Sequence, residues 1–122
     1  MAFIIDAVYD NGLSYAQTNG TRLDITSAEA ATYAQATSNL TLGNKVVTVS
    51  APSNGEVDGR RVQVPEITAG TVTGTGDATH WALTNGTDEL IATGTLTSQS
   101  VTSGNTFSLS AISITLRDAT AV

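Results

Sequence analysis

The chain has 122 residues, a net charge of −6 and no cysteine, and only 13% of its residues are charged, against about 25% in typical soluble domains. The missing cysteines exclude disulfides, thiol catalysis and cysteine-based zinc sites, and the acidic balance argues against nucleic-acid phosphates and anionic membranes as partners. The length suits one domain, residues 1–122, and the 21 threonines and 11 glycines favour short strands joined by tight turns.

The first predicted element is a strand over Phe3–Tyr9, closed by a turn at Asp10–Gly12 that contains an Asn-Gly pair. The apolar run Ala2–Ile5 is short and no charged segment precedes it, so a secretory signal peptide is not expected. No run approaches the roughly 18 apolar residues of a membrane span.

A second strand is predicted over Thr21–Thr26, where Leu23 and Ile25 alternate with Arg22 and Asp24. This alternation is typical of a half-buried strand, and it predicts that both charges lie on the solvent face.

The alanine-rich segment that follows is ambiguous. Thr26 and Glu29 have the spacing of a capping box, but Tyr33 is the only bulky anchor in the run. A short helix and a loop are therefore equally good predictions. Asn44–Ser50 then predicts a strand, and residues 51–59 predict a long exposed loop.

The run RRVQVPEIT, residues 60–68, predicts another strand. Its two valines face one way, and Arg61 and Gln63 face the other. Pro65 lacks a backbone N–H, so the strand is expected to lie at a sheet edge or to end there. The threonine–glycine run 70–76 predicts a strand or a bulged ribbon.

A hairpin is predicted from ATHWALT and ELIATGTL, which flank the turn NGTD at residues 85–88. Trp81 and Leu83 share one face of the first arm. The opposite face is expected to carry Ala78, His80, Ala82 and Thr84.

The last predicted strand changes parity, because Phe107, Leu109 and Ala111 alternate on one face whereas the apolar residues from Ile112 onward take the other. Such a switch predicts a β-bulge or a strand that passes between two sheets. The tail 117–122 predicts a surface terminus. Six residues are expected in the core: Trp81, Leu83, Phe107, Leu109, Ile112 and Ile114.

These patterns predict one all-β domain, a compact β-sandwich or small barrel-like domain with at most one short helix. The regular spacing of the predicted strands, with turns between them, is typical of both architectures.

No catalytic, cofactor or metal site is predicted. His80 is the only histidine, and neither a second metal ligand of its kind nor a nucleophile motif accompanies it. The loop Asn54–Gly59 imitates the start of a calcium loop, but Pro65 stands at the twelfth position, where such a loop needs glutamate. We therefore expect an acidic loop there, no small-molecule substrate and no enzymatic activity.

Three stretches of the chain resemble a family of small proteins of tailed bacteriophages and prophages that are encoded among head genes. They are residues 6–27, residues 41–45 together with 58–83, and residues 90–114. The most specific pieces are TRLDI, ATHWAL and VTSGNTF. The likeness covers nearly the whole chain.

The resemblance implies a structural virion protein, most plausibly a capsid decoration or cement protein on the capsid exterior. Such proteins bind junctions between copies of the major capsid protein, often as trimers, so the expected partners are that protein and copies of this chain. Many equivalent sites multiply a modest affinity per contact. Five residues are candidate contacts to the capsid or a neighbour: Phe3, Ile4, Ile5, Arg60 and Arg61.

Simpler interpretations of these residues stay open: Phe3–Ile5 also fits an ordinary first strand, and the arginine pair also fits an edge strand protected against aggregation. Other functions stay open as well, among them a tail, connector or head-fibre base component. An Ig-like or carbohydrate-binding module is poorly supplied with aromatic residues, at 5% of the chain. A small hydrolase has the least support.

Overall fold

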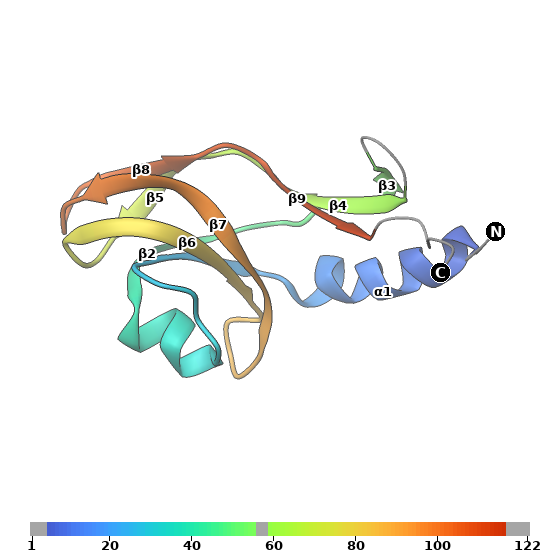
Figure 1. Cartoon of the computed structure of the whole chain (residues 1–122), viewed down its shortest axis with the longest axis horizontal. Coiled ribbons are helices and arrows are strands. Elements are labelled where there is room, and N and C mark those ends of the chain that lie inside the picture. The colour runs from blue at the N-terminus through green and yellow to red at the C-terminus, as the bar shows by residue number, and fades with distance from the viewer. Residues whose placement is uncertain (1–4, 56–58, 117–122) are drawn as a thin grey trace, which may run out of the picture.

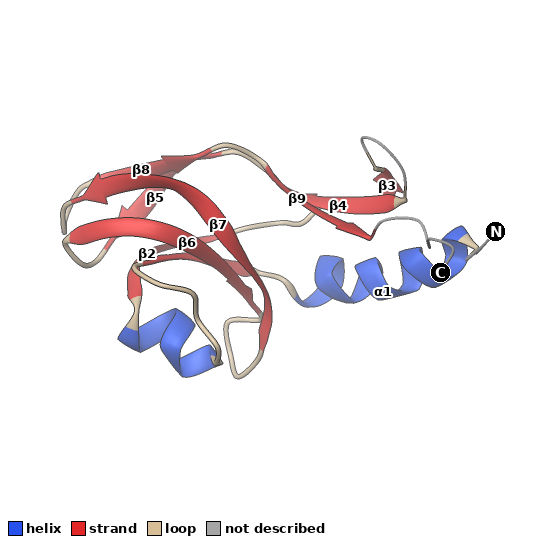
Figure 2. Ribbon diagram, viewed as in Figure 1, coloured by secondary structure: helices blue, strands red, loops and turns tan. Residues whose placement is uncertain are grey.

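The computed structural model describes residues 5–55 and 59–116, which form a curled six-stranded antiparallel sheet, a three-stranded sheet and one α-helix of 14 residues. Figure 1 shows the curled sheet at one end of the molecule and α1 with the small sheet at the other, and Figure 2 shows how strands dominate. The predicted all-β class is confirmed. The elements are α1 (Asp6–Asn19), β1 (Arg22–Thr26), the π-helical turn η1 (Gln35–Asn39), β2 (Thr41–Val46), β3 (Ser53–Asn54), β4 (Arg60–Val64), β5 (Ile67–Val72), β6 (Gly76–Thr84), β7 (Leu90–Val101), β8 (Thr106–Leu109) and β9 (Ile112–Leu116).

The six-stranded sheet has the order β7-β6-β1-β2-β5-β8, with the predicted β6–β7 hairpin at one end. Strand β1 lies between β6 and β2, and its register sets Leu23 beside Leu83 and Ile25 beside Trp81. All four side chains belong to the main hydrophobic core. The central strands thus bury the alternate apolar positions that the sequence indicates.

The outer face of β1 is also buried, which corrects the prediction that both of its charges face solvent. Asp24 is 0% exposed, because the segment between β1 and β2 covers this face and packs Ala30 and Ala36 against Ala82. The buried carboxylate is paired with Arg22, whose Nε and Nη2 lie 2.8 Å and 3.0 Å from its two oxygens. A buried charge requires such partners.

The strand predicted over Phe3–Tyr9 and the turn at Asp10–Gly12 are wrong wherever the structure describes them, because α1 occupies Asp6–Asn19. Phe3 and Ile4 lie outside the described residues. The helix buries Tyr9, Leu13 and Ala16, a spacing that lines up on one helical face. Docking of that face outweighs the strand propensity of the apolar start and the turn propensity of the Asn-Gly pair.

The small sheet has the order β3-β4-β9 and lies over α1. Strand β4 buries both of its valines and ends at Val64, immediately before Pro65, as predicted. The parity switch is also confirmed as a change of sheet, because β8 ends the six-stranded sheet and β9 pairs with β4.

Two further predictions need adjustment, and one open alternative is resolved. The strand predicted at Asn44–Ser50 runs over Thr41–Val46 instead. Ala78 joins the core with Trp81 rather than the opposite face, because the register shifts between Ala78 and His80. Within the ambiguous alanine-rich segment the chain forms η1.

Of the six predicted core residues, Trp81, Leu83 and Phe107 are buried. Leu109, Ile112 and Ile114 are partly buried and pack against the same cluster. Within the loop 51–59 the chain forms the short strand β3. Residues 56–58 of that loop and the tail 117–122 lie outside the described residues.

Candidate functional site

The two candidate arginines point to opposite faces of β4 and do different work. Arg60 faces α1, where its Nε and Nη2 lie 2.8 Å and 3.2 Å from the two carboxylate oxygens of Asp10. Its Nη1 also donates to Oδ1 of Asn54 at 2.7 Å. A two-pronged contact between arginine and a carboxylate fixes geometry as well as charge. Arg60 therefore fastens α1 to the small sheet.

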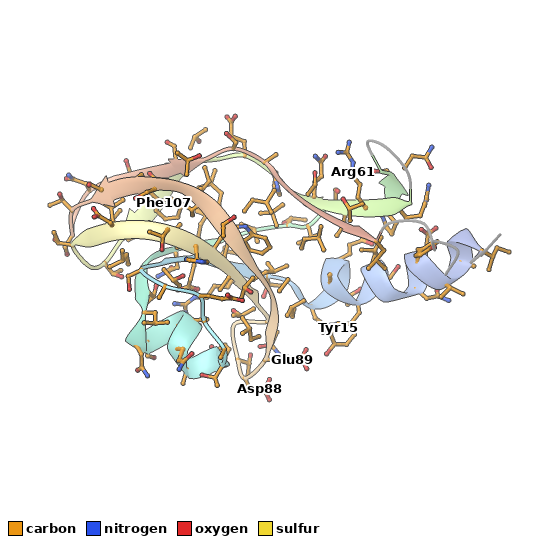
Figure 3. The ribbon with its side chains drawn as sticks, in the orientation of Figure 1. Tyr15, Arg61, Asp88, Glu89 and Phe107 are labelled. Atoms are coloured by element: carbon orange, nitrogen blue, oxygen red, sulfur yellow. The ribbon has the colours of Figure 1, made fainter. Side chains whose placement is uncertain are left out.

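Arg61 lies on the far side of β4 from α1 (Figure 3). Its Nη1 donates to Oγ of Ser113 at 3.3 Å, and Gln63 donates to the same oxygen at 3.1 Å. The structure thus separates the pair, and only Arg61 faces outward.

The third described candidate, Ile5, is the N-cap residue of α1 and is 58% exposed. It begins an exposed helical stripe that continues through Val8, Gly12 and Tyr15, at i+3, i+7 and i+10. Val8 and Tyr15 are 59% and 51% exposed. We call these four residues the α1 stripe. Interpreting this segment as a strand concealed the stripe, because strand alternation places Ile5 and Val8 on opposite faces.

Tyr15 ends the α1 stripe with a hydrogen bond from its hydroxyl to the carboxylate of Glu89, in the β6–β7 turn. This bond raises the pKa of Tyr15 above its usual value, and desolvation and the negative charges of Glu89 and Asp88 act in the same direction. The contact joins α1 to the six-stranded sheet. Figure 3 shows Tyr15 and Glu89 at the meeting point of the two.

His80 is half-buried on β6, and its Nδ1 lies 2.8 Å from Oγ1 of Thr79. Across residues 5–55 and 59–116, no three histidine or acidic side chains are grouped so as to hold a metal ion. No helix among these residues has both the length and the apolar character to cross a membrane.

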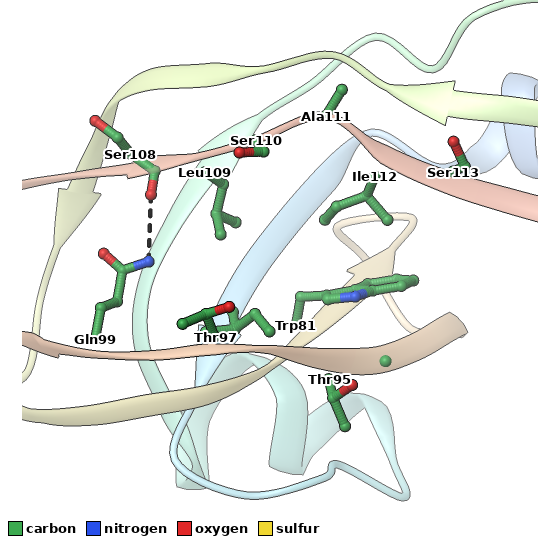
Figure 4. Close-up of a pocket in the computed structure, with 12 residues that line it drawn as sticks. Trp81, Thr95, Thr97, Gln99, Ser108, Leu109, Ser110, Ala111, Ile112 and Ser113 are labelled. Atoms are coloured by element: carbon green, nitrogen blue, oxygen red, sulfur yellow. Dashed lines mark hydrogen bonds between the residues drawn. The ribbon is translucent and has the colours of Figure 1, made fainter.

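A concave feature runs between β7 and the consecutive strands β8 and β9 (Figure 4). Its first section has a volume of about 550 Å³ and is lined by β7 residues 94–97 and Gln99, by residues 108–113 and by Trp81. A second section of about 570 Å³ lies between the next residues of the same strands and α1. We call the first section the β7–β8 groove.

The β7–β8 groove has an apolar floor and a hydroxyl-rich rim. Leu109 and Ile112 point down toward Trp81 in Figure 4, whereas the rim is formed by serine, threonine and Gln99. All twelve lining residues are uncharged. Gln99 stretches across the opening, and its Nε2 donates to the backbone oxygen of Ser108 at 3.2 Å.

Trp81 forms the floor because Gly94 lies opposite it on β7. A β-carbon at Gly94 would stand 2.6 Å from the indole ring, so only glycine lets the ring lie across the strand. Trp81 is consequently 8% exposed. The sequence carried one signal for this arrangement, a glycine that the hairpin register sets against the only tryptophan.

Comparisons of the chain with protein-family models, with curated proteins and with solved structures find no match. The function must therefore be argued from the residues and their geometry.

Proposed function

We propose that this protein is a structural component of a tailed-phage virion, a capsid decoration protein that binds the outside of the major capsid protein lattice. The resemblance of nearly the whole chain to phage head-region proteins supports the proposal. Two of its most specific pieces, TRLDI and ATHWAL, lie mainly on the neighbouring strands β1 and β6, and VTSGNTF spans the turn between β7 and β8.

The α1 stripe is the surface that the proposal assigns to contact with the capsid. Ile5 and Val8 expose more than half of their surface at one end of an acidic molecule, and apolar side chains exposed side by side mark protein contacts. Arg60 holds this helix on the small sheet, so the stripe is presented by a fixed element. Phe3 and Ile4, the other apolar candidate contacts, precede Ile5 in the sequence and lie outside the described residues.

The other candidate functions have less support. A sugar-binding platform needs an open aromatic face. The Trp81 ring instead lies against the backbone of Gly94, and Trp81 is only 8% exposed. A tail, connector or head-fibre base component would use the same kind of apolar surface. The number of copies bound per capsid therefore distinguishes such a component from a decoration protein.

Co-sedimentation of the purified protein with capsids of its phage tests the proposal. We expect saturation at hundreds of copies per shell, in fixed ratio to the major capsid protein. Binding of a dozen copies or fewer would assign the protein to a vertex or the tail, and no binding would refute the proposal.

A matched pair of variants tests the surface. Val8→Asp adds a charge to the α1 stripe at a first-turn position, where a carboxylate favours the helix, and Val46→Asp adds the same charge at a β2 site that is 80% exposed. We expect Val8→Asp to weaken capsid binding at least about tenfold and Val46→Asp to leave it unchanged. Equal effects of the two substitutions would exclude the α1 stripe as the contact.

A further inference from the structure

The two walls of the β7–β8 groove are both unfinished sheet edges. β7 and β8 are the two end strands of the six-stranded sheet, and β9 is an end strand of the small sheet. In the described residues each of these strands pairs on one side only. An end strand offers a row of backbone N–H and C=O groups to any extended chain beside it.

One side chain bridges the two walls of the groove. Gln99 extends from β7, and its Nε2 donates to the backbone oxygen of Ser108 on β8 at 3.2 Å (Figure 4). A β8 main-chain acceptor in the groove is therefore satisfied by a side chain and not by a neighbouring strand.

We propose that the β7–β8 groove binds an extended segment of a partner polypeptide, which adds as a strand along β7 and displaces the Gln99 side chain. Alternate side chains of that segment would face the floor formed by Trp81, Leu109 and Ile112, and the others would face solvent. Main-chain hydrogen bonds supply affinity in this mode, and the floor selects apolar residues. Strand addition does not require the proposed role on the capsid.

The occupant is a partner rather than a second copy of this chain. Every described strand is already paired within its own sheet, so a strand from a second copy would bring its sheet neighbours with it. The net charge of −6 also makes copies repel each other. An uncharged groove in an acidic protein suits a neutral or basic segment.

The inference is tested with a library of random ten-residue peptides selected on the full-length protein. Trp81 is the only tryptophan and forms the floor, so its fluorescence reports occupancy during titration of the enriched peptides. We expect apolar residues at alternate peptide positions, a saturable change in Trp81 emission, and at least about tenfold weaker binding when proline replaces a central residue, because proline cannot donate to a ladder.

Variants at Gln99 supply the structural control. Gln99→Ala removes the side chain that occupies the strand position and should strengthen binding, whereas Gln99→Arg is longer, carries five donors and should weaken it at least about tenfold. Gln17→Arg adds the same charge on α1, outside both sections of the cavity, and should bind like the unmodified protein.

Four results would overturn the inference. They are failure to enrich any peptide, equal binding of the proline-containing peptide, equal affinities for Gln99→Arg and Gln17→Arg, and a concentration-dependent change in Trp81 emission without peptide. The last would assign the groove to a second copy. None of them bears on capsid co-sedimentation, and loss of co-sedimentation leaves peptide binding unaffected.

Discussion

Gly94 shows how one missing side chain shapes the floor of the β7–β8 groove. The indole of Trp81 lies where a β-carbon at this position would stand, 2.6 Å from three ring atoms. We expect Gly94→Ala to lower the free energy of unfolding by about 1–3 kcal/mol, the usual cost of overpacking a core, and to move the Trp81 ring. Denaturant unfolding and the Trp81 emission spectrum measure both effects.

Gly74→Ala is the matched control for this substitution. A β-carbon at Gly74 would meet its nearest neighbour, Leu42, at 3.4 Å, and this glycine does not have a positive φ. It should change stability by no more than about 0.5 kcal/mol. Alanine for glycine at a compatible backbone conformation restricts the unfolded chain and does not itself destabilise, so a loss at Gly74 as large as that at Gly94 would show that contact with the ring does not set the cost.

Ile5 has two roles that one substitution can separate, one at the N-terminus of α1 and one in the α1 stripe. It is the N-cap of α1, yet no side-chain cap hydrogen bond forms there, and its side chain is 58% exposed. Ile5→Ser should therefore stabilise the protein by about 1 kcal/mol, because a serine side chain at the N-cap accepts a hydrogen bond from a backbone N–H of the first turn. The same change removes an apolar side chain from the α1 stripe, so capsid binding should fall while thermal stability rises. A fall in both would mean that Ile5 supports the fold.

At the scale of elements, the contact between α1 and the β6–β7 turn depends on pH. The hydrogen bond from Tyr15 to Glu89 raises the pKa of Tyr15. A raised pKa in the folded state means that the contact stabilises the protein below the unfolded-state pKa of about 10 and is lost as pH rises through the folded-state value. The stability difference between the unmodified protein and Tyr15→Phe should therefore vanish in strong base.

Absorbance of tyrosinate gives the direct measurement for this prediction. Titration of the folded protein should show a tyrosine component that ionises above the usual value because of Tyr15, and the contribution of Tyr15 should be absent from Tyr15→Phe. Tyr33→Phe, on the segment between β1 and β2, should leave the component in place. Its persistence in Tyr15→Phe would contradict the assignment to Tyr15.

The sequence predicted those elements whose side-chain pattern agrees with their final surroundings. The hairpin of β6 and β7, the end of β4 before Pro65 and the passage from β8 to β9 all follow from period-two alternation and turn chemistry. α1 was missed because Asn11–Gly12 imitates a turn and the helix has no side-chain cap. This segment forms a helix because it docks against β4 and Arg60, which lies far along the chain.

Burial on both faces of β1 was missed for a related reason. Alternation of Leu23 and Ile25 with Arg22 and Asp24 is what a half-buried strand shows, and the cover over the outer face comes from a small-residue segment with little hydrophobic signal. The ion pair to Arg22, and a hydrogen bond from Thr41 at 2.7 Å, make burial of Asp24 tolerable. Neither partner can be assigned from spacing alone.

The candidate site, too, has some features that local sequence patterns predict and others that they do not. Ile5, chosen as a candidate contact within an expected strand, is exposed at the start of a helix. The adjacent arginines were candidate contacts together, but alternation along β4 sends Arg60 to Asp10 and Arg61 to Ser113. The β7–β8 groove depends on two edges meeting through the curl of a sheet, which no local pattern encodes.

At the scale of the whole molecule, the two ends share one hydrophobic core. The main cluster joins Leu13 of α1 and Val64 of the small sheet to Leu23, Trp81 and Phe107 of the curled sheet. A core that spans both ends leaves no boundary along which either could unfold alone. We therefore expect a single cooperative transition, with Trp81 fluorescence and helical circular dichroism changing at the same denaturant concentration.

The test is sharpest with Arg60→Ala, which removes the tie to Asp10 and Asn54. If the core is shared, this variant should shift both signals together to lower denaturant, because loosening α1 exposes Leu13 and weakens the packing beneath Trp81. Loss of the helical signal before the Trp81 signal would instead show that α1 and the small sheet form a separate unit. In that case α1, which carries the proposed capsid contacts, would be able to unfold without disturbing the β7–β8 groove.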